Sequence, residues 1–472
     1  MSVIRADKYG IEPVYYTTHD GKFLSGRTIK ELVLRPKIDL YALREYFTFQ
    51  NIVSDRTLFK GVKVVPPGCE VNPDGTLHRY FYFETGFPTR KDKYKDCVEH
   101  LRILLNVAVW HSMFQTSQTP VGGLLSGGLD SSVIATFAQE DYLYPTFTVG
   151  FMDYRKFDES ELATLVAKHL NLVNHQLLLG PSALPDTIDK VTEALEELRI
   201  SITYPDYAAY QLASMSVKTL LTGTGGDELF AGYPWKYKAS DSEYLAMVQR
   251  LVPERDHSEF FSDYVMRETQ GYSPLEEFHR RYRYDTIYDR FYIDLKFGLF
   301  GQLITNDKLA RRHGLQVKYP FLDDELVQFA LSLPAEYKYK NGVGKRILRD
   351  AMKGLLPRNI IKRPKQGFYP PDEHWYRNEN AEFVGKKFDS LKKTDFFKPY
   401  YLDKIYVEHM SGVNHTRLLW SLMSFESWLR INRINRINED GVHFIYNAEF
   451  REDLKRFEEE RDKLELARYY PR

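Results

Sequence analysis

A stretch of serines, glycines and one aspartate carries the residue types that phosphate chemistry needs. It has the sequence Ser-Gly-Gly-Leu-Asp-Ser-Ser at 126–132, between the apolar runs 121–125 and 133–138. This order predicts a buried strand, a tight turn and a helix that begins with hydroxyl groups. Glycines allow a close approach of the backbone, and the N-terminus of a helix favours an anion. The stretch therefore predicts a phosphate cradle, in which the Asp130 carboxylate can hold a metal ion.

A second glycine turn supplies paired acids. The segment Gly223–Tyr233 follows an apolar strand expected at 218–221, and it contains Asp227 and Glu228. Acids that directly follow a strand, beside a phosphate cradle, can bind a metal and accept a proton. Taken singly, either turn is also compatible with an ordinary capped helix. Two such turns in one predicted sheet favour an active site.

Strands alternate with helices through the middle of the chain. Strands are expected at 121–125, 145–151, 175–179 and 218–221, and helices at 158–170, 186–197 and 205–216. This alternation predicts an α/β fold with a doubly wound parallel sheet, whose ligands lie beyond the carboxyl ends of the strands. Residues 1–83 indicate a small β-rich region that contains one helix, at 39–49, and a hairpin at 69–81. Further helical periodicity lies at 94–112, 323–356 and 414–432.

Length and composition favour a multidomain globular protein. The 472 residues suffice for two or three domains, and the charged fraction of 28% is that of a soluble protein. The formal net charge of zero gives no overall attraction to nucleic acid or to an anionic membrane. The basic, tyrosine-containing run at 280–284 could contact nucleic acid, but a solvated helix face is the favoured interpretation.

The isolated cysteines and the N-terminal residues indicate in which cellular compartment the protein is expected. Cys69 and Cys97 are isolated, so neither a disulfide framework nor a zinc site is expected. The N-terminus has no apolar signal region, and no apolar run is long enough to span a membrane. We therefore expect a cytoplasmic enzyme without a membrane or nucleic-acid partner.

The first turn resembles the pyrophosphate loop of the ATP pyrophosphatases, which split ATP into AMP and pyrophosphate. It is not a Walker loop, because no Gly-x-x-x-x-Gly-Lys-Ser/Thr is present. From near residue 1 to about residue 432, the chain resembles the asparagine synthetases of the glutamine-using class. The stretches that carry this resemblance are Ser126–Ser132, Phe147–Phe151, Asp158–Ser160, Gly223–Tyr233, Tyr319–Asp323, Gly344–Arg349 and Arg363–Phe368.

The resemblance implies a domain division. It places a synthetase domain of the ATP pyrophosphatase type at 91–436. Before it, at 1–90, it implies a β-rich remnant of an N-terminal-nucleophile glutaminase domain that lacks the nucleophile half. Residues 437–472 form a charged tail with helical spacing, for which we expect a helix.

The resemblance also assigns roles to single residues, with ATP and Mg²⁺ as cofactors. The expected pyrophosphate ligands are Ser126, Gly127, Gly128, Asp130, Ser131 and Ser132, and the expected nucleotide-pocket residues are Leu124, Val149 and Gly225. Mg²⁺ is expected on Asp130 and Asp227. Glu228 falls on an acid of the family motif and is the expected base. Lys365 falls where synthetases place a lysine near the reacting oxygens, and Asp307 is a further candidate in the acceptor site. A surface ion pair for Lys365 and a helix cap for Asp307 are the plainer alternatives.

Three departures from the family pattern bear on the substrates. The family glutaminase uses an N-terminal cysteine, where this chain has Met1-Ser2, so we expect no glutamine hydrolysis by this chain alone. Thr224 stands where synthetases usually carry an acid and the β-lactam-forming relatives a tyrosine. Gln316 replaces the glutamate that usually precedes the Pro-Phe-Leu-Asp stretch. The last two changes leave the identity of the acid open without affecting ATP.

Together these features predict an ATP-dependent, AMP-forming amide ligase that joins a small-molecule carboxylate to an amine. Ammonia, from solution or from a separate glutaminase subunit, is the expected nitrogen source. An organic amine, as in relatives that close β-lactams or lasso peptides, is the alternative. A pseudoenzyme that serves as a regulatory subunit is a third hypothesis, which the retained acids and Lys365 disfavour. The sequence leaves open whether the chain forms a homo-oligomer.

Overall fold

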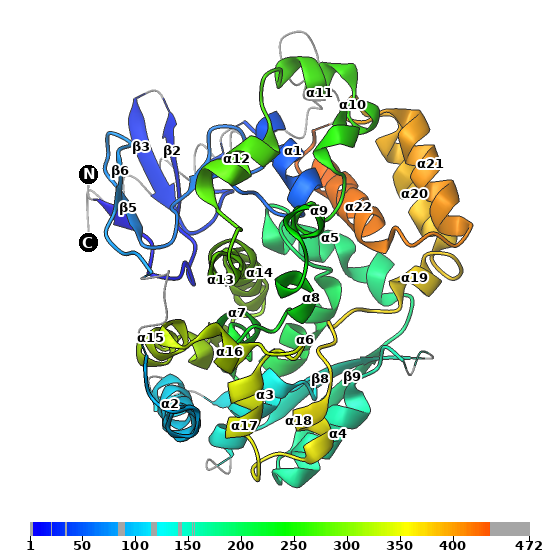
Figure 1. The fold of residues 1–472 in the computed structure, drawn as a ribbon. Coiled ribbons are helices and arrows are strands. Elements are labelled where there is room, and N and C mark those ends of the chain that lie inside the picture. The colour runs from blue at the N-terminus through cyan, green and yellow to red at the C-terminus, as the bar shows by residue number, and fades with distance from the viewer. Residues whose placement is uncertain are drawn as a thin grey trace, which may run out of the picture.

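The computed structural model describes residues 3–19, 21–33, 35–83, 90–114, 120–139, 144–152, 154 and 156–434. Residues 84–89 and the tail expected at 437–472 lie outside the described residues. Figure 1 shows the N-terminal strands beside a larger α/β body, with the last helices of the chain packed on the opposite side of that body.

A five-stranded parallel sheet organises the α/β body. Its strands are β7 (Val121–Leu124), β8 (Thr146–Phe151), β9 (Asn174–Leu179), β10 (Thr219–Leu221) and β11 (Gln316–Lys318). They lie in the order β11-β10-β7-β8-β9, and every neighbouring pair is parallel. All six residues of β8 are buried, as expected for an inner parallel strand that is covered on both faces. The predicted doubly wound parallel sheet is confirmed.

Helices cover both faces of this sheet. In the view of Figure 1, α4 (Ser160–His169) lies below β8 and β9 and α6 (Tyr204–Ser214) lies above them, and both contact these strands. In α4 the residues Ala163, Val166 and Ala167 are buried, while Lys168 is exposed. Apolar positions three or four residues apart give a helix one apolar face, which here packs on the sheet.

The remaining helices fill the body around the sheet. They are α1 (Leu40–Phe49), α2 (Tyr94–Phe114), α3 (Leu129–Ala138), α5 (Ala183–Leu195), α7 (Gly226–Leu229), α8 (Pro234–Tyr237), α9 (Asp241–Val248), α10 (His257–Phe260), α11 (Asp263–Glu268), α12 (Pro274–Arg281), α13 (Ile287–Ile293), α14 (Leu299–Arg312), α15 (Asp324–Ser332), α16 (Ala335–Lys338), α17 (Arg346–Ala351), α18 (Arg358–Lys362), α19 (Asp372–Trp375), α20 (Ala381–Leu391), α21 (Pro399–Met410) and α22 (Thr416–Ile431). The helical periodicity at 323–356 is thus divided among α15, α16 and α17. Pro334 separates the first two, because a residue before proline is disfavoured in a helix.

The N-terminal region contains two small antiparallel sheets. One consists of β2 (Tyr15–His19), β3 (Lys22–Gly26) and β4 (Lys63–Val64), and the other of β1 (Ile4–Arg5), β5 (Cys69–Val71) and β6 (Leu77–Arg79). The predicted β-rich region is confirmed, as is the helix expected at 39–49, which is α1. The Asp39 side chain caps α1 by accepting hydrogen bonds from the N–H groups of Tyr41 and Ala42.

Helix α1 joins the N-terminal region to the rest of the hydrophobic core. Its residue Phe47 is fully buried, and its ring lies 5.2–6.1 Å from the rings of four phenylalanines in distant segments, Phe260, Phe261, Phe397 and Phe425. One cluster of buried apolar residues therefore runs from the first strands to α22. The division into domains near residue 90 stays a prediction. No helix within the described ranges combines the length and the apolar character that crossing a membrane requires.

We expect Phe47→Ala to lower the free energy of unfolding by about 3–5 kcal/mol, because it leaves a cavity among the four phenylalanine rings. Phe114→Ala is the matched control, since Phe114 is 62% exposed and its loss should change stability by less than about 0.5 kcal/mol. Urea denaturation followed by circular dichroism measures both. Equal effects of the two substitutions would contradict the assignment of Phe47 to the shared core.

Candidate active site

The two glycine turns lie at the carboxyl ends of neighbouring strands. The first follows β7 and the second follows β10, and these strands pair in parallel, with Gly122 opposite Leu220. The chain proceeds from β7 to β8 and β9 on one side and places β10 and β11 on the other. This is the point of the sheet at which the strand order reverses, where parallel α/β sheets form a crevice for ligands. The fold thus brings both predicted turns to one place.

Glycines allow the two turns to touch. A Cβ atom on Gly223 would lie 2.7 Å from the backbone N of Ser131, and one on Gly226 would lie 2.7 Å from Cγ of Asp130. Gly127 adopts a left-handed φ of +70°, and a Cβ there would lie 2.6 Å from Leu162 Cβ. Larger residues at Gly223 or Gly226 would push the second turn away from the first turn of α3, and a larger residue at Gly127 would collide with α4.

The serines of the first turn hold its shape at the start of α3. Ser131 Oγ accepts a hydrogen bond from the Ser126 N–H and donates one to the Gly128 carbonyl, each at 3.2 Å. Ser132 Oγ donates to the same carbonyl at 2.7 Å. Gly128 is the N-cap of α3 without a side-chain cap, so the positive end of this helix faces the turn. An anion can bind there.

The three residues expected to line the nucleotide pocket lie around the same crevice. Leu124 is the last residue of β7, and Val149 lies in the adjacent strand β8 and is buried. Gly225 precedes α7 with a left-handed φ of +98°, and a Cβ there would approach Leu322 to 3.1 Å. These positions belong to neighbouring strands and to the second turn.

Two carboxylates and two lysines meet between the turns. Lys345 Nζ lies 2.5 Å from Asp130 Oδ2 and also forms an ion pair with Asp227 Oδ1. Lys365 Nζ lies 2.5 Å from Asp227 Oδ2. Burial opposes the charge on Asp227, but the two lysines outweigh it and hold the pKa of this carboxyl well below its usual range. The lysines therefore keep a buried aspartate ionised.

The pKa of the Asp130 carboxyl is shifted in the opposite direction from that of Asp227. Burial raises the pKa of the Asp130 carboxyl, Lys345 opposes this, and the nearby charge of Asp227 adds to the increase. Its Oδ1 atom is buried and has no hydrogen-bond partner among the described residues. A buried carboxylate oxygen without a partner is costly, and a bound cation would satisfy it.

Lys345 is a member of the cluster that the sequence did not indicate as a site residue. It directly precedes α17 with a left-handed φ of 56°, and its N–H donates to the Phe230 carbonyl at 2.9 Å. The preceding Gly344 leaves no room for a side chain, because a Cβ there would lie 2.0 Å from the Ala231 carbonyl oxygen. The only sequence signal for Lys345 is the Gly344–Arg349 stretch, in which the glycine allows the backbone beside Lys345 to pack closely against Ala231.

Glu228 lies beside this cluster in α7. It is buried, and Tyr233 Oη donates a hydrogen bond to its Oε1 at 2.6 Å. Burial raises the pKa of Glu228 to about 7, with a further increase from the charge of Asp227 and a decrease from the Tyr233 hydrogen bond. A carboxylate with a pKa near neutrality can accept a proton at physiological pH.

The acidic set suits Mg²⁺ only together with phosphates. Asp130 and Asp227 offer two carboxylates, and the described residues contain no group of three or more histidine, cysteine or acidic side chains that could hold a metal. Mg²⁺ commonly binds one or two carboxylates and completes its shell with water and substrate phosphates. The partnerless Oδ1 of Asp130, beside the helix N-terminus, fits that arrangement.

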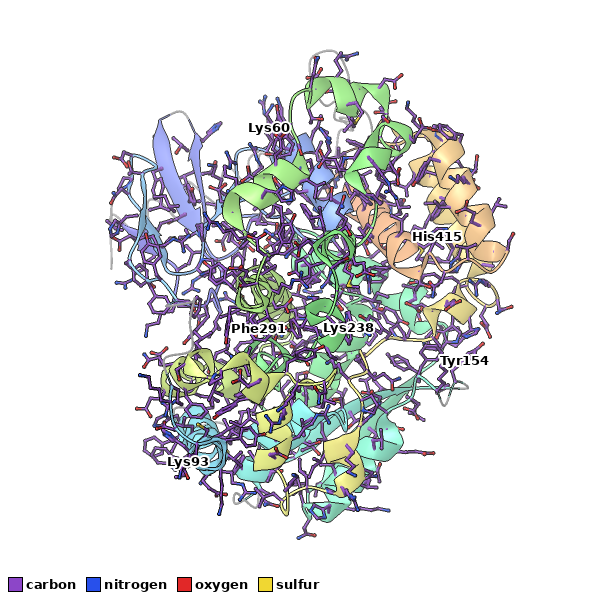
Figure 2. The ribbon with its side chains drawn as sticks, viewed as in Figure 1. Lys60, Lys93, Tyr154, Lys238, Phe291 and His415 are labelled. Atoms are coloured by element: carbon purple, nitrogen blue, oxygen red, sulfur yellow. The ribbon has the colours of Figure 1, made fainter. Side chains whose placement is uncertain are left out.

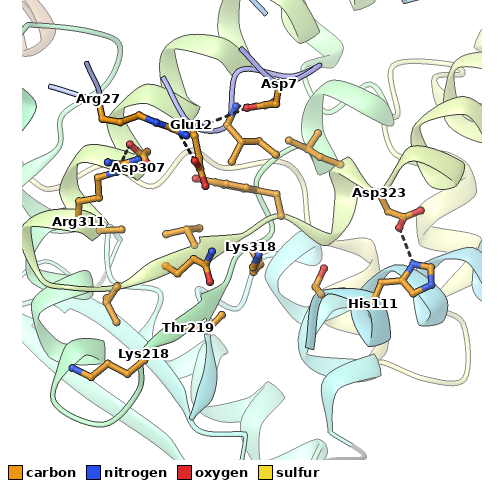
Figure 3. Close-up of a pocket in the computed structure, with 18 of the residues that line it drawn as sticks. Asp7, Glu12, Arg27, His111, Lys218, Thr219, Asp307, Arg311, Lys318 and Asp323 are labelled. Carbon is orange, nitrogen blue, oxygen red and sulfur yellow. Dashed lines mark hydrogen bonds and ion pairs between the residues drawn. The ribbon is translucent and has the colours of Figure 1, made fainter. Parts of the chain in front are cut away.

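Asp307 lies apart from the lysine–carboxylate cluster. It lines a pocket of about 920 Å³ between α14 and the N-terminal region, and the pocket lining includes neither Asp130 nor Asp227 (Figure 3). There Asp307 forms an ion pair with Arg311 at 2.9 Å. The adjacent Asn306 donates a weak hydrogen bond of 3.4 Å to Thr224 Oγ1 in the second turn. The role of Asp307 in an acceptor site stays a prediction.

We expect Lys345→Gln to destabilise the protein by about 3–5 kcal/mol in urea denaturation, because it leaves two buried carboxylates with one counter-charge fewer. Lys353→Gln is the matched control: its side chain is 69% exposed in an i,i+3 pair, so the loss should stay below about 1 kcal/mol. An unchanged stability of Lys345→Gln would mean that the carboxylates do not depend on Lys345.

The sequence matches two known families over most of its length. The family model described as "Asparagine synthase" matches residues 100–430, and the one described as "Glutamine amidotransferase domain" matches residues 1–82. "Asparagine synthetase [glutamine-hydrolyzing] 1" of Bacillus subtilis (strain 168) is 27% identical over 474 residues, which cover 90% of this chain and 74% of that protein. The "Putative asparagine synthetase [glutamine-hydrolyzing]" of Mycobacterium tuberculosis (strain ATCC 25618 / H37Rv) is 26% identical, with 89% and 73% covered.

Among solved structures, the "NH3-dependent NAD synthetase" from Campylobacter jejuni matches at 16% identity with a TM-score of 0.20, over 57% of this chain and 98% of that one. The Asparagine synthase match, in contrast, covers well over half of the sequence. The chain therefore belongs to the asparagine synthase family of ATP-dependent amide ligases.

Proposed function

We propose that this protein adenylates a small-molecule carboxylate with ATP, releases pyrophosphate and transfers the acyl group to ammonia. The observation that supports this best is the meeting of Asp130, Asp227, Lys345 and Lys365 at the N-terminus of α3. Two cations, of which Lys345 is buried, and two largely buried carboxylates at a helix N-terminus can bind a nucleoside triphosphate and its metal.

In the first step, a carboxylate oxygen attacks the α-phosphorus of ATP. The bond from this phosphorus to the oxygen that bridges to the β-phosphorus breaks, and pyrophosphate leaves with the electron pair. Both reactants are anions, so the site must neutralise their charge. Lys365 and Lys345 supply two ammonium groups, and the flanking aspartates keep the pKa of Lys365 above its ordinary value. Mg²⁺ on Asp130 and Asp227 would add Lewis-acid stabilisation of the phosphate oxygens.

In the second step, the amine nitrogen attacks the acyl carbon, and the bond from that carbon to the AMP oxygen breaks. The nitrogen then loses a proton, for which Glu228 is the nearest candidate base beside the cluster. Its pKa of about 7 leaves it partly unprotonated at neutral pH. The hydrogen bond from Tyr233 fixes the orientation of the carboxylate, so one oxygen stays available for the incoming proton.

The cysteines bear on the nitrogen source. Cys69 and Cys97 are both buried, and burial raises the pKa of each thiol. A cysteine that attacks glutamine has to be accessible and readily ionised, and neither thiol meets these conditions. We therefore propose that ammonia reaches the site from solution or from a separate glutaminase subunit. An organic amine is the alternative.

Pyrophosphate release from ATP and Mg²⁺ tests the proposal. The assay combines a panel of carboxylic acids with ammonia, with organic amines or with glutamine, and AMP is measured in parallel. Equal amounts of pyrophosphate and AMP with at least one acid support an adenylating ligase. Release of phosphate and ADP, or no nucleotide turnover by folded protein that binds ATP, would overturn the proposal and favour the pseudoenzyme.

We expect Glu228→Gln to lower amide formation by about 10²–10⁴-fold while pyrophosphate release persists, because the base acts only in the second step. In the wild type, the rate should rise with pH through about 7 as Glu228 loses its proton, and this rise should disappear in Glu228→Gln. The measurement is a pH profile at a constant concentration of unprotonated ammonia. Glu382→Gln, which alters a surface ion pair, is the control. A retained pH dependence in Glu228→Gln would assign the proton to another group.

We also expect Cys69→Ala and Cys97→Ala, singly and together, to leave ammonia-dependent turnover within about twofold of the wild type, provided that the buried thiols act only as small apolar groups. Glutamine should give no turnover with any of the four proteins. The decisive measurement is glutamate release from glutamine. Glutamate production by the wild type that is lost in one variant would identify a cysteine nucleophile in this chain.

A further inference from the structure

A second cavity contains two arginines. Its volume is about 420 Å³, and it lies where residues 250–251 after α9, the segment between α18 and α19, and the start of α22 meet. Arg250 and Arg417 both line it. Figure 2 labels His415, another lining residue, on the side of the molecule that carries the C-terminal helices. The volume falls in the range of small-molecule sites.

The charge in this cavity is unbalanced. Within the described part of the chain, neither Arg250 nor Arg417 forms an ion pair with a carboxylate. The lining residue Glu373 does not compensate them, because it already binds Arg377 at 2.9 Å and Asn414 at 2.6 Å. Burial lowers the pKa of the Arg250 guanidinium, and the neighbouring charge of Arg417 lowers it further. Two adjacent cations without an anion favour a bound anion.

The start of α22 adds to the positive potential. This helix has 16 residues, and its N-cap residue His415 provides no side-chain cap, although the Thr416 N–H donates to Asn414 Oδ1 at 3.0 Å; the N-terminal end of the helix dipole lies at the cavity. Thr416 Oγ1 is buried and has no hydrogen-bond partner among the described residues. A hydroxyl donor without a partner, next to two guanidinium groups, is suited to the oxygen atoms of a carboxylate or a phosphate.

The cavity adjoins the reacting end of the candidate site. Tyr369, which lines the cavity, follows Lys365 by four residues in a segment without helix. A molecule that extends from Lys365 along this segment would therefore place its far end at the arginines.

The remaining walls are apolar. Phe157, Ile202, Leu251 and Leu418 line the cavity between the charged groups. An aliphatic or aromatic chain gains free energy by burial against such walls. A small, fully polar acid would leave them without contacts.

We infer that this cavity binds the non-reacting end of the acyl substrate, and that the substrate is an organic acid with an apolar middle and a second anionic group. This inference rests on the proposed function, because the first carboxylate has to meet ATP near Lys365. Arg250 and Arg417 would then determine specificity by binding the second anionic group. The proposed substrate is therefore larger than aspartate and differs from it, because aspartate has no apolar middle.

Turnover with matched acids tests the inference. The panel pairs suberate with octanoate and adipate with hexanoate, and adds aspartate. We expect kcat/KM for each diacid to exceed that of its monoacid by about 10–100-fold, the contribution of a charge-assisted hydrogen bond. Arg417→Gln and Arg250→Gln should each remove most of this difference by raising KM for the diacids more than KM for the monoacids. Arg417→Lys should restore part of it. Arg430→Gln, at the far end of α22 and paired with Asp189, is the matched control.

Direct binding separates this inference from the proposed function. Titration calorimetry with suberate, in the presence of a non-hydrolysable ATP analogue, is performed on the wild type and on Arg417→Gln. Suberate binding that Arg417→Gln weakens supports the inference even if no acid is turned over, in which case the proposed function alone fails. Equal turnover of monoacids and diacids, preference for aspartate, or suberate binding that is absent or insensitive to both arginine substitutions would overturn the inference, while the adenylating activity can still stand.

Discussion

The repulsion between two neighbouring, largely buried carboxylates is the constraint on which the candidate site depends. Asp130 and Asp227 follow neighbouring strands, so the parallel sheet forces them together at its carboxyl edge. Two like charges in a buried place cost several kcal/mol each unless cations and hydrogen bonds compensate them. Lys345 lies between both aspartates, and Lys365 binds the second. The segments that carry these lysines are therefore tied to the sheet by charge as well as by apolar packing.

This arrangement connects stability to ligand binding. The lysines that neutralise the aspartates in the protein alone are also the groups that phosphate oxygens would attract. A nucleotide and its metal would supply an anion for the lysines and a cation for the aspartates, so both sets of charges would stay balanced after binding. The site can thus hold its charged groups ready without a large rearrangement, which is the condition for electrostatic stabilisation of a transition state.

Local sequence patterns predict the two glycine turns of this site, whereas contacts between distant parts of the chain bring in its two lysines. The serine turn and the acids of the second turn are short stretches next to apolar strands, so periodicity and glycine placement indicated both. Lys345 lies 215 positions from its partner Asp130, and Lys365 lies 138 positions from Asp227. No periodicity encodes such separations; only the resemblance to a family indicated Lys365. Similarly, Phe47 joins the first region to the C-terminal helices through ring contacts that the sequence of α1 does not reveal.

Charge also gives the site a direction. The lysines lie at the crevice of the sheet, and Arg250 and Arg417 lie in the cavity lined by Tyr369, four residues after Lys365. An acid with one anionic group would be attracted to either end and could bind in two orientations. An acid with two anionic groups could satisfy both ends at once, which would hold its reacting carboxylate at the lysines. The positions of the cations thus favour a substrate that is charged at both ends.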